Sequence, residues 1–392
     1  MHVSSLRKKP GAIVVCVAAI AMLAAAVPAA ASSLAGGSAA SAFSNTQCAA
    51  SGATANKEFS PGGAVANSGT DSTAAIQNAI NTASAAGGGF VPLTAGTYTL
   101  DGYLLMKSNV KLIGVGSTTI LKAGPGFLDK IGPNGGYPVV TTVGASNVTI
   151  KNLTADQSGN VLNGNANPST RLAGYLIDIR DSRNAVVSGV YTRNPFTYSI
   201  AVVGSSDFCV TGSNTQEATS GKYNQLDGIH ILDSNTGQVI GNHVDQRIGT
   251  DGDDGLVAHS MAGPVYDVLY ANNSVRGGNN GDGMQFAVGD YPIHDITVRD
   301  NDFYGSPYGI RTGYYDTDSN GAVYNILIIG NYIHNLVPGN AFPDGGNAVD
   351  MGGFGAIGPV TYVTVTQNDI FKAGVIIVVS GTGNSAYDND TL

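Results

Sequence analysis

The sequence is poor in several residue types, and each shortage excludes a class of protein. Its 392 residues contain no tryptophan, and only 12% are charged. The formal net charge is −9, so the chain lacks the basic balance that binding to nucleic acid or an anionic membrane requires. We therefore expect neither partner. Only two of the 28 acidic residues are glutamates, which leaves short carboxylates suited to turns and tight sites.

Cysteine is also scarce. Three cysteines are present, and Cys16 lies in an N-terminal apolar run. Cys48 and Cys209 are 161 residues apart (209 − 48), and the sequence leaves open whether they form a disulfide in an exported protein. The spacing of the cysteines excludes a zinc cluster and a cysteine-nucleophile motif.

Long apolar runs are missing, apart from one near the N-terminus. Arg7, Lys8 and Lys9 precede an apolar run over 12–27, and alanines at 29–31 offer a cleavage site. Because the run is shorter than the roughly 20 residues of a membrane span, we predict a secretory signal peptide over 1–31. Its removal would change the net charge from −9 to about −12 (16 − 28). Residues 32–64 then form an Ala/Ser/Gly-rich linker and N-terminal segment, and 65–392 the folded domain. We expect a secreted monomer, extracellular or periplasmic.

One helix is predicted, at the start of the domain. The stretch TDSTAAIQNAINTASAAGGG, residues 70–89, has Thr70 or Asp71 as a cap, apolar residues at helical spacing, and terminal glycines. Residues 90–100 then alternate like a strand. This opening is similar to that of pectate-lyase-like proteins, in which a helix caps a β-helix.

The rest of the chain repeats a short β-branched strand that ends in a polar residue. Such segments lie at 147–155, 238–246, 267–277, 295–305, 325–335 and 362–372. They align on Asn242, Asn273, Asn301, Asn331 and Asn368, at steps of 31, 28, 30 and 37 residues. A unit of this size cannot bury a core alone, so neighbouring units must stack. We predict an all-β fold, a single right-handed parallel β-helix with a short N-terminal capping α-helix. The asparagines would form a ladder in left-handed turns.

A second register lies between the asparagines, with a polar residue, then glycine, then an apolar residue. The polar position is held on successive coils, at steps of 27, 28 and 26 residues, by Asp227, Asp254, Asp282 and Tyr308. Stacked like charges indicate raised pKa values, a bound cation or a solvated turn. Asp253 adds a further carboxylate, and it can reach the same cleft as Asp254 only if the backbone departs from an ideal strand there. Gly252 and Gly255 allow this. Asp251 has no counterpart on other coils, and a turn role suffices for it.

These motifs resemble those of polygalacturonase-type (family 28) glycoside hydrolases, which carry NTD-G, G/Q-D-D, G-H-G and R-I-K on successive coils. The sequence has, in the same order, NQLDG at 224–228, GDDG at 252–255, GDG at 281–283 and RTG at 311–313. The β-helix dextranases and α-1,3-glucanases are also similar. The resemblance implies a polysaccharide-degrading, inverting glycoside hydrolase. Asp253 would be its general acid, and Asp227 and Asp254 would activate a water, with acid and base about 6.5–9.5 Å apart. Arg311 would bind the substrate.

The sequence departs from that family at two positions. Asp282 replaces the family's histidine, and Gly313 replaces the lysine that holds a uronate carboxylate. A neutral polysaccharide is therefore at least as well supported as galacturonan. The other candidates for substrate contact are Asp282, His230, Tyr308 and Tyr314. His259 is expected in a loop.

Two other functions stay open. A calcium-dependent polysaccharide lyase would use Arg311 as a base and hold the ion with Asp251, Asp253, Asp254 and Asp282. A second loop with alternating carboxylates, Asp316 and Asp318, is also compatible with calcium, and no other cofactor is predicted. A non-catalytic glycan-binding β-helix would leave the aspartate ladder solvated. Loops at 124–142, 157–172 and 336–360 are expected to wall the cleft.

Overall fold

The computed structural model describes residues 48, 54–162, 174–216, 225–246, 252–314, 319–352, 358–371 and 377–391. The predicted signal peptide and most of the predicted linker lie outside these residues. Residues 40–392 belong to one compact unit. Among the described residues, no helix is long and apolar enough to cross a membrane.

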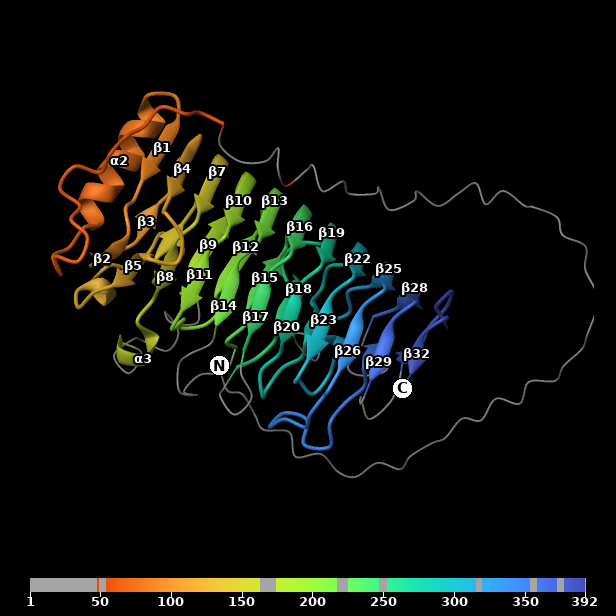
Figure 1. The fold of residues 1–392 in the computed structure, drawn as a ribbon. Coiled ribbons are helices and arrows are strands. Elements are labelled where there is room, and N and C mark those ends of the chain that lie inside the picture. Colours follow the sequence, from red (N-terminus) through yellow and green to blue (C-terminus); the bar gives the residue numbers. More distant parts are fainter. Residues whose placement is uncertain are drawn as a thin grey trace, which may run out of the picture. The chain divides into compact units, whose positions relative to one another are not determined.

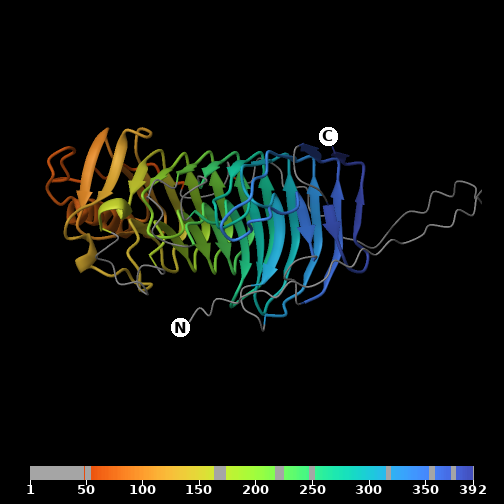
Figure 2. The ribbon, with the colours of Figure 1, turned by 90° about the horizontal axis from the view of Figure 1, so that it is seen from below.

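The fold is the predicted parallel β-helix, whose coils follow one another from the N-terminal to the C-terminal end of the stack (Figures 1 and 2). Each complete coil contributes one strand to each of three parallel sheets. Sheet A contains β1 (Gly89–Pro92), β4 (Val110–Ile113), β7 (Ser146–Lys151), β10 (Arg183–Ser188), β13 (Ser206–Thr211), β16 (Asn235–Ile240), β19 (Val265–Ala271), β22 (Ile293–Arg299), β25 (Val323–Ile329), β28 (Val360–Thr366) and β31 (Ser385–Tyr387).

Sheet B contains β2 (Gly96–Leu100), β5 (Thr119–Ala123), β8 (Thr154–Asp156), β11 (Tyr191–Arg193), β14 (Asn214–Gln216), β17 (His243–Asp245), β20 (Ser274–Arg276), β23 (Asp302–Tyr304), β26 (Tyr332–His334), β29 (Asp369–Phe371) and β32 (Asp390–Thr391). Sheet C contains β3 (Leu104–Leu105), β6 (Val140–Thr141), β9 (Ile177–Arg180), β12 (Ile200–Val203), β15 (Ile229–Leu232), β18 (Leu256–Ser260), β21 (Met284–Val288), β24 (Ile310–Tyr314), β27 (Val349–Met351) and β30 (Ile377–Val379).

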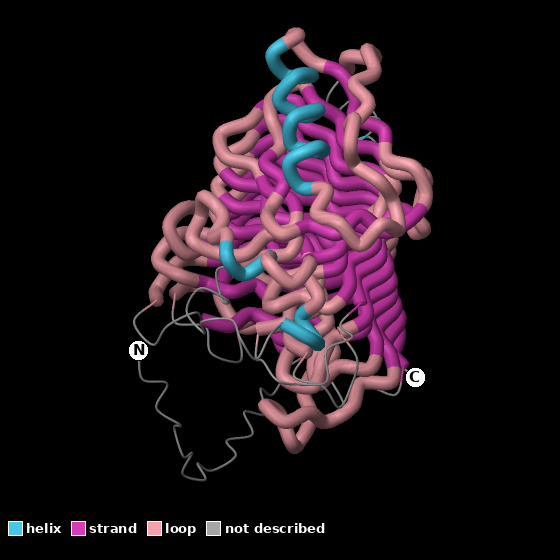
Figure 3. Tube along the Cα trace, turned by 90° about the vertical axis from the view of Figure 1, so that its left-hand side faces the viewer, coloured by secondary structure: helices cyan, strands magenta, loops and turns pink. Residues whose placement is uncertain are grey.

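The predicted helix is α2 (Thr73–Ala85), which lies at the N-terminal end of the stack (Figure 3). Its apolar face, including Ile76 and Ile80, is buried against the first coil. Ser72 occupies the cap position, and Asp71 accepts a hydrogen bond from the Thr73 amide at 2.9 Å. The helix therefore covers core that would otherwise be open at the end of the stack. Two further short helical segments are α3 (Gly159–Leu162) and a 3₁₀ turn at Phe127–Asp129.

The core is made of aliphatic side chains that stack from coil to coil. In sheet C one such row, fully buried and paired in register, is Ile177, Ile200, Ile229, Leu256, Met284, Ile310 and Val349. Burial of each side chain of this kind stabilises the fold by about 1.5–3 kcal/mol. Since side chains alternate along a strand, the residue after each of these points outward. The outer face of sheet C is therefore mostly polar in this row, which consists of Asp178, Ala201, His230, Val257, Gln285, Arg311 and Asp350.

The asparagine ladder is confirmed. Asn242, Asn273, Asn301, Asn331 and Asn368 are buried, and each donates from Nδ2 to the Oδ1 atom of the next ladder asparagine at 2.9 Å. The expected left-handed turn is displaced by one residue. It lies at the preceding position, for example Asn272 (φ 54°) and Asp300 (φ 55°). The ladder side chain is thereby turned into the stack, where it bridges neighbouring coils, and Asn331 and Asn368 also donate to a backbone carbonyl two residues earlier.

Cys48 and Cys209 are joined in a disulfide with a Cα–Cα distance of 5.4 Å. The sequence had left this pairing open. Cys209 lies on β13 and is buried. The bridge therefore joins Cys48 to the fifth strand of sheet A.

Candidate active site

The candidate residues lie where each coil enters sheet C. Asp227, Asp254, Asp282 and Tyr308 precede β15, β18, β21 and β24. Amide-to-carbonyl bonds of 2.9–3.0 Å join the glycine after each aspartate to the next member of the row. The structure therefore has the predicted register, with three aspartates and one tyrosine on four adjacent coils.

The glycines in this register permit close approach of the coils. A Cβ atom on Gly228 would lie 2.5 Å from the carbonyl oxygen of Gly255, and one on Gly255 would lie 2.8 Å from that of Gly283. Such distances are too short for any side chain. The Asp-Gly steps thus keep the aspartates on neighbouring coils at the strand spacing of about 4.8 Å.

Asp253 is held in place by the glycine-rich stretch 277–283 of the next coil. The Asp253 carbonyl accepts a hydrogen bond from the Gly278 amide at 2.8 Å. A Cβ atom on Gly281 would lie 2.5 Å from the Asp253 Oδ1 atom, so only glycine fits there. Asp253 precedes β18 and is outside any strand, which lets it share a side with Asp254. The sequence analysis attributed the position of Asp253 to its flanking glycines, Gly252 and Gly255. The contacts that hold Asp253 come instead from glycines of the neighbouring coil.

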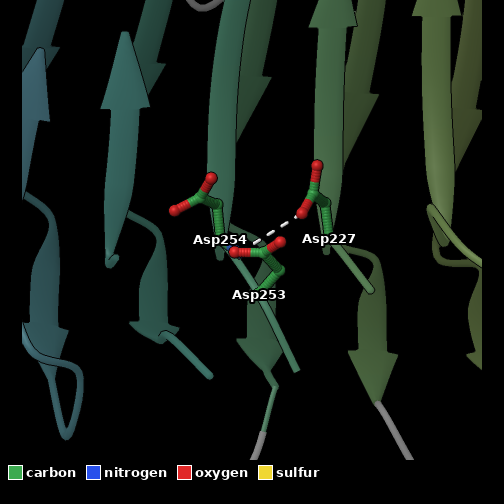
Figure 4. A group of neighbouring side chains, drawn as sticks. All are labelled: Asp227, Asp253 and Asp254. Carbon is green, nitrogen blue, oxygen red and sulfur yellow. Dashed lines mark hydrogen bonds between the residues drawn. The ribbon is translucent and has the colours of Figure 1, made fainter. Parts of the chain in front are cut away.

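Asp227, Asp253 and Asp254 converge (Figure 4). One oxygen from each lies within 4.8 Å of the others, and Asp253 lies between the other two in the view shown. The Asp254 amide donates to Asp227 Oδ1 at 3.2 Å, and the Gln225 amide donates to Asp253 Oδ2 at 3.1 Å. These closest oxygens are nearer than the roughly 6.5–9.5 Å expected between acid and base in inverting glycosidases. The same three oxygens are also close enough to share a cation.

Burial and mutual repulsion raise the pKa values of these carboxyls. Burial raises the pKa of Asp227 to about 8, and burial together with the charges of Asp227 and Asp282 raises that of Asp253 to about 8. The pKa of Asp254 lies well above its usual range for the same reasons. When one carboxyl of such a group ionises, it opposes the ionisation of the next. The cluster therefore holds a protonated carboxyl beside an ionised one over an intermediate range of pH.

Among the described residues, Arg311 is the cation of this cluster, and it is paired with Asp282. Its Nε donates to Asp282 Oδ2 at 2.6 Å, and the two side chains are 7% and 0% exposed. With its amide oriented to satisfy both neighbours, Gln285 accepts from Arg311 Nη2 at 2.7 Å and donates to Asp254 Oδ2 at 3.3 Å. Hydrogen bonds thus link Asp282 to Arg311, Arg311 to Gln285, and Gln285 to the Asp254 carboxylate, which is held in place by this chain of contacts.

Two histidines extend the cluster in the other direction. Asp227 Oδ2 lies 2.6 Å from His230 Nδ1, and His230 Nε2 lies 3.0 Å from His259 Nδ1. Burial lowers the pKa of both imidazoles to about 3. His259 lies on β18, not in the expected loop. The face of His230 is covered by Tyr198, with ring centroids 4.0 Å apart. His230 is therefore positioned to orient Asp227.

An aromatic and charged group that the sequence did not single out continues the outer face toward the N-terminal coils. Tyr175 stacks on Tyr198 at 4.6 Å, and the Arg180 guanidinium lies 5.0 Å from the Tyr175 ring. Asp178, almost fully buried, accepts from Arg180 Nε at 2.9 Å through both oxygens. Arg180 and Arg311 are thus each bonded to a carboxylate of the protein itself.

Of the remaining residues predicted from the sequence, only Tyr308 has a side chain in the described part of the structure. Tyr308 is 7% exposed and lies 5.4 Å from the Arg311 guanidinium, measured to the ring centroid. Tyr314 is the last residue of β24, and its side chain is outside the described part of the structure. Asp251, Asp316 and Asp318 also lie outside the described residues.

Comparisons with known proteins agree with this architecture. Residues 61–244, less than half of the chain, match the family model described as rhamnogalacturonase A/epimerase, pectate lyase-like. No curated protein matches the sequence. Similar solved structures include an exopolygalacturonase from Thermotoga maritima (TM-score 0.65, 15% identity, 87% of this chain and 93% of that one). A polygalacturonase from Erwinia carotovora is also similar (0.63, 16%, 87% and 96%).

A third similar structure is a tailspike protein mutant of the Escherichia coli bacteriophage HK620, solved with a pentasaccharide (TM-score 0.59, 16% identity, 82% of this chain and 60% of that one). Identities this low establish the fold alone. The fold is that of the pectin-lyase-like right-handed parallel β-helix proteins.

Proposed function

We propose that this pectin-lyase-like β-helix protein is an exported, monomeric glycoside hydrolase that cleaves a polysaccharide. The observation that carries the proposal is the convergence of three aspartates with raised pKa values on the outer face of sheet C (Figure 4). Hydrolysis of a glycosidic bond requires one protonated and one ionised carboxyl at the same place. Polygalacturonases with this fold provide a parallel for a polysaccharide substrate.

Asp253 is the proposed general acid. It is the most exposed of the three aspartates, and burial together with the charges of Asp227 and Asp282 raises its pKa to about 8, which favours its protonated form. Its proton passes to the glycosidic oxygen as the bond from that oxygen to the anomeric carbon breaks. The leaving chain thus departs as an alcohol.

Asp227 and Asp254 are the proposed pair that activates water. A water that bonds both at about 2.8 Å fits between oxygens up to about 5.6 Å apart, and the observed separation is within 4.8 Å. The water adds its oxygen to the anomeric carbon, and its proton moves to the ionised member of the pair. His230 holds Asp227, and Gln285 holds Asp254, so both carboxyls keep a fixed orientation.

The charges of the site favour an uncharged polysaccharide. Arg311, which the resemblance assigned to substrate, is bonded to Asp282, and the family's lysine is replaced by Gly313. Among the described residues of the site, a uronate would meet several carboxylates, and Arg311, the cation beside them, is already bonded to Asp282. Desolvation of such unpaired charge is costly.

The direct test is hydrolysis of a panel of neutral and anionic polysaccharides, with detection of new reducing ends. We expect release from at least one neutral glycan by the wild-type protein and none by the Asp253→Asn variant. Undiminished release by the variant would reject the assignment of Asp253. Binding without release by the wild type would instead indicate a glycan-binding protein.

A calcium-dependent lyase is the second candidate, because three carboxylate oxygens within 4.8 Å of one another are hard ligands of the kind Ca²⁺ prefers. Asp227, Asp253 and Asp254 would hold the ion, which would neutralise a uronate, and Arg311 would be the base. Chelation would then abolish activity, and the products would contain an unsaturated sugar that absorbs ultraviolet light. Activity that survives chelation and yields saturated products supports hydrolysis.

A further inference from the structure

A cavity of about 400 Å³ lies on the C-terminal side of the aspartate cluster, beyond Tyr308. Its lining consists of Pro307, Tyr308, Leu336, Val337, Pro338, Asp344, Gly345, Gly346 and Asn347. The outer wall comes from residues 336–347, which follow β26. They belong to the longest step of the asparagine ladder, 37 residues against 28–31 elsewhere. The extra length of this one coil therefore builds the cavity.

The wall is fitted closely to Tyr308. A Cβ atom on Gly346 would lie 2.2 Å from the Tyr308 Cε2 atom, so the backbone packs directly on that ring. Phe342 meets the same ring edge-on, with centroids 5.0 Å apart, and the Arg311 guanidinium lies 4.9 Å from the Phe342 ring. Since Arg311 is also bonded to Asp282, the contacts from Phe342 to Arg311 and from Arg311 to Asp282 connect the cavity wall to the aspartate cluster.

The position of the cavity suits a longer substrate. Asp254, Asp282 and Tyr308 occupy equivalent positions on three successive coils, so Asp254 and Tyr308 are roughly 10 Å apart at about 4.8 Å per coil. A glycan that runs along the stack from the bond beside Asp253 would enter the cavity after a short oligosaccharide.

The lining suits a sugar without charge. Pro307, Leu336, Val337 and Pro338 offer apolar walls for the C–H faces of a pyranose. Asn347 and Asp344 offer polar atoms for its hydroxyls, and Asn347 is itself oriented by a 2.8 Å bond to Asp350. No residue in this lining is basic, and Asp344 is exposed in it, so a uronate is disfavoured. The volume falls in the usual range for ligand sites.

We propose that this cavity is a distal subsite for an uncharged sugar residue of the polysaccharide, and that it sets the preference for longer chains. The inference rests on the proposed hydrolase function. It adds a binding site at a distance from the bond that is cleaved.

The test compares Val337→Trp, which fills the cavity, with Val115→Trp, which adds the same side chain at an exposed position on an early coil. Substrates are neutral oligosaccharides from disaccharide to octasaccharide, of the isomalto, cello and galacto series. We expect Val337→Trp to lower kcat/KM about tenfold or more on the longest substrates and little on the shortest. Equal losses at every length, or no loss at any length, would overturn the proposal. Asp344→Ala serves as a second, less disruptive variant, with a smaller loss of the same form.

A binding experiment separates failure of the subsite from failure of the hydrolase assignment. The same oligosaccharides are titrated calorimetrically into Asp253→Asn and into Asp253→Asn combined with Val337→Trp. Tighter binding of longer chains that disappears with the filled cavity supports the subsite, even if the wild type hydrolyses none of them. Absence of a length dependence refutes the subsite, even if the wild type is an active hydrolase.

Discussion

Replacement of Asp253 by asparagine removes the proposed acid while preserving the shape of the side chain. Asp253 bonds the Gln225 amide through Oδ2, and asparagine can keep that bond through its amide oxygen. The glycine-rich stretch that packs against the Asp253 backbone is unaffected. We therefore expect a folded protein with a specific defect in proton donation.

The size of the defect follows from the loss of the proton donor. Burial and the charges of Asp227 and Asp282 raise the pKa of Asp253, which favours the protonated form that a general acid needs. Asparagine donates no proton at any pH. Loss of a general acid lowers the rate about 10²- to 10⁴-fold, or about 3–5 kcal/mol in the activation barrier.

The assay uses two substrates that differ only in the leaving group. One is a natural oligosaccharide, and the other is the corresponding dinitrophenyl glycoside, whose leaving group departs without a proton. Asp253→Asn should lose most of its kcat on the first and little on the second. Asp290→Asn, at an exposed aspartate, is the control and should match the wild type. An equal loss on both substrates would refute the role of Asp253 as the acid.

Three further predictions concern the cluster and its scaffold. Burial raises the pKa of Asp254, so the folded state keeps a proton that the unfolded state loses above about pH 4. The free energy of unfolding therefore falls as pH rises above that value, by at most about 1.4 kcal/mol per pH unit. Asp254→Asn should therefore stabilise the protein in urea unfolding more at pH 8 than at pH 4, and an equal effect at both would count against the shift. His230→Phe keeps an aromatic ring stacked on Tyr198 but removes the hydrogen bond to Asp227. It should lower kcat about ten- to hundredfold with little change in KM. A change in KM alone would instead indicate that His230 contacts the substrate. Asn301→Ala leaves at least two buried partners unpaired, at about 1–3 kcal/mol each, and should reduce the free energy of unfolding by about 2–6 kcal/mol. A loss no larger than that of Asn340→Ala would contradict the ladder's role.

The fold was predictable because equivalent positions on stacked coils need similar residues, so the same residue types recur in the sequence once per coil. Asn242 and its equivalents recur once per coil, since each must meet the next at the same depth in the stack. The glycines after Asp227 and Asp254 recur because the coils approach too closely for a side chain there. The displaced left-handed turn shows the limit of this reasoning. An asparagine that recurs once per coil indicates a structural requirement at that position. The sequence alone does not show whether the requirement is a left-handed backbone conformation or a side-chain hydrogen bond to the next coil.

The site was predictable in register and not in detail. The row that contains Asp227, Asp254 and Asp282 follows from counting residues between coils. The support of Asp253 by Gly278 and Gly281, and the bond from His230 to His259, join residues on different coils whose side-chain directions the period does not specify. Loops of unequal length also bring in groups that have no counterpart on other coils, such as residues 336–347 around the cavity.

The anomeric configuration of the first product tests the central claim most directly. Proton NMR during early hydrolysis of the best substrate resolves the two anomers before they interconvert. Activation of water by Asp227 and Asp254, with Asp253 as the acid, predicts an inverted product. The close approach of the three carboxylates, within 4.8 Å, makes this measurement informative, since carboxyl groups about 5–5.5 Å apart are typical of retaining enzymes. A retained anomer, formed through a covalent intermediate on one of these aspartates, would contradict the account.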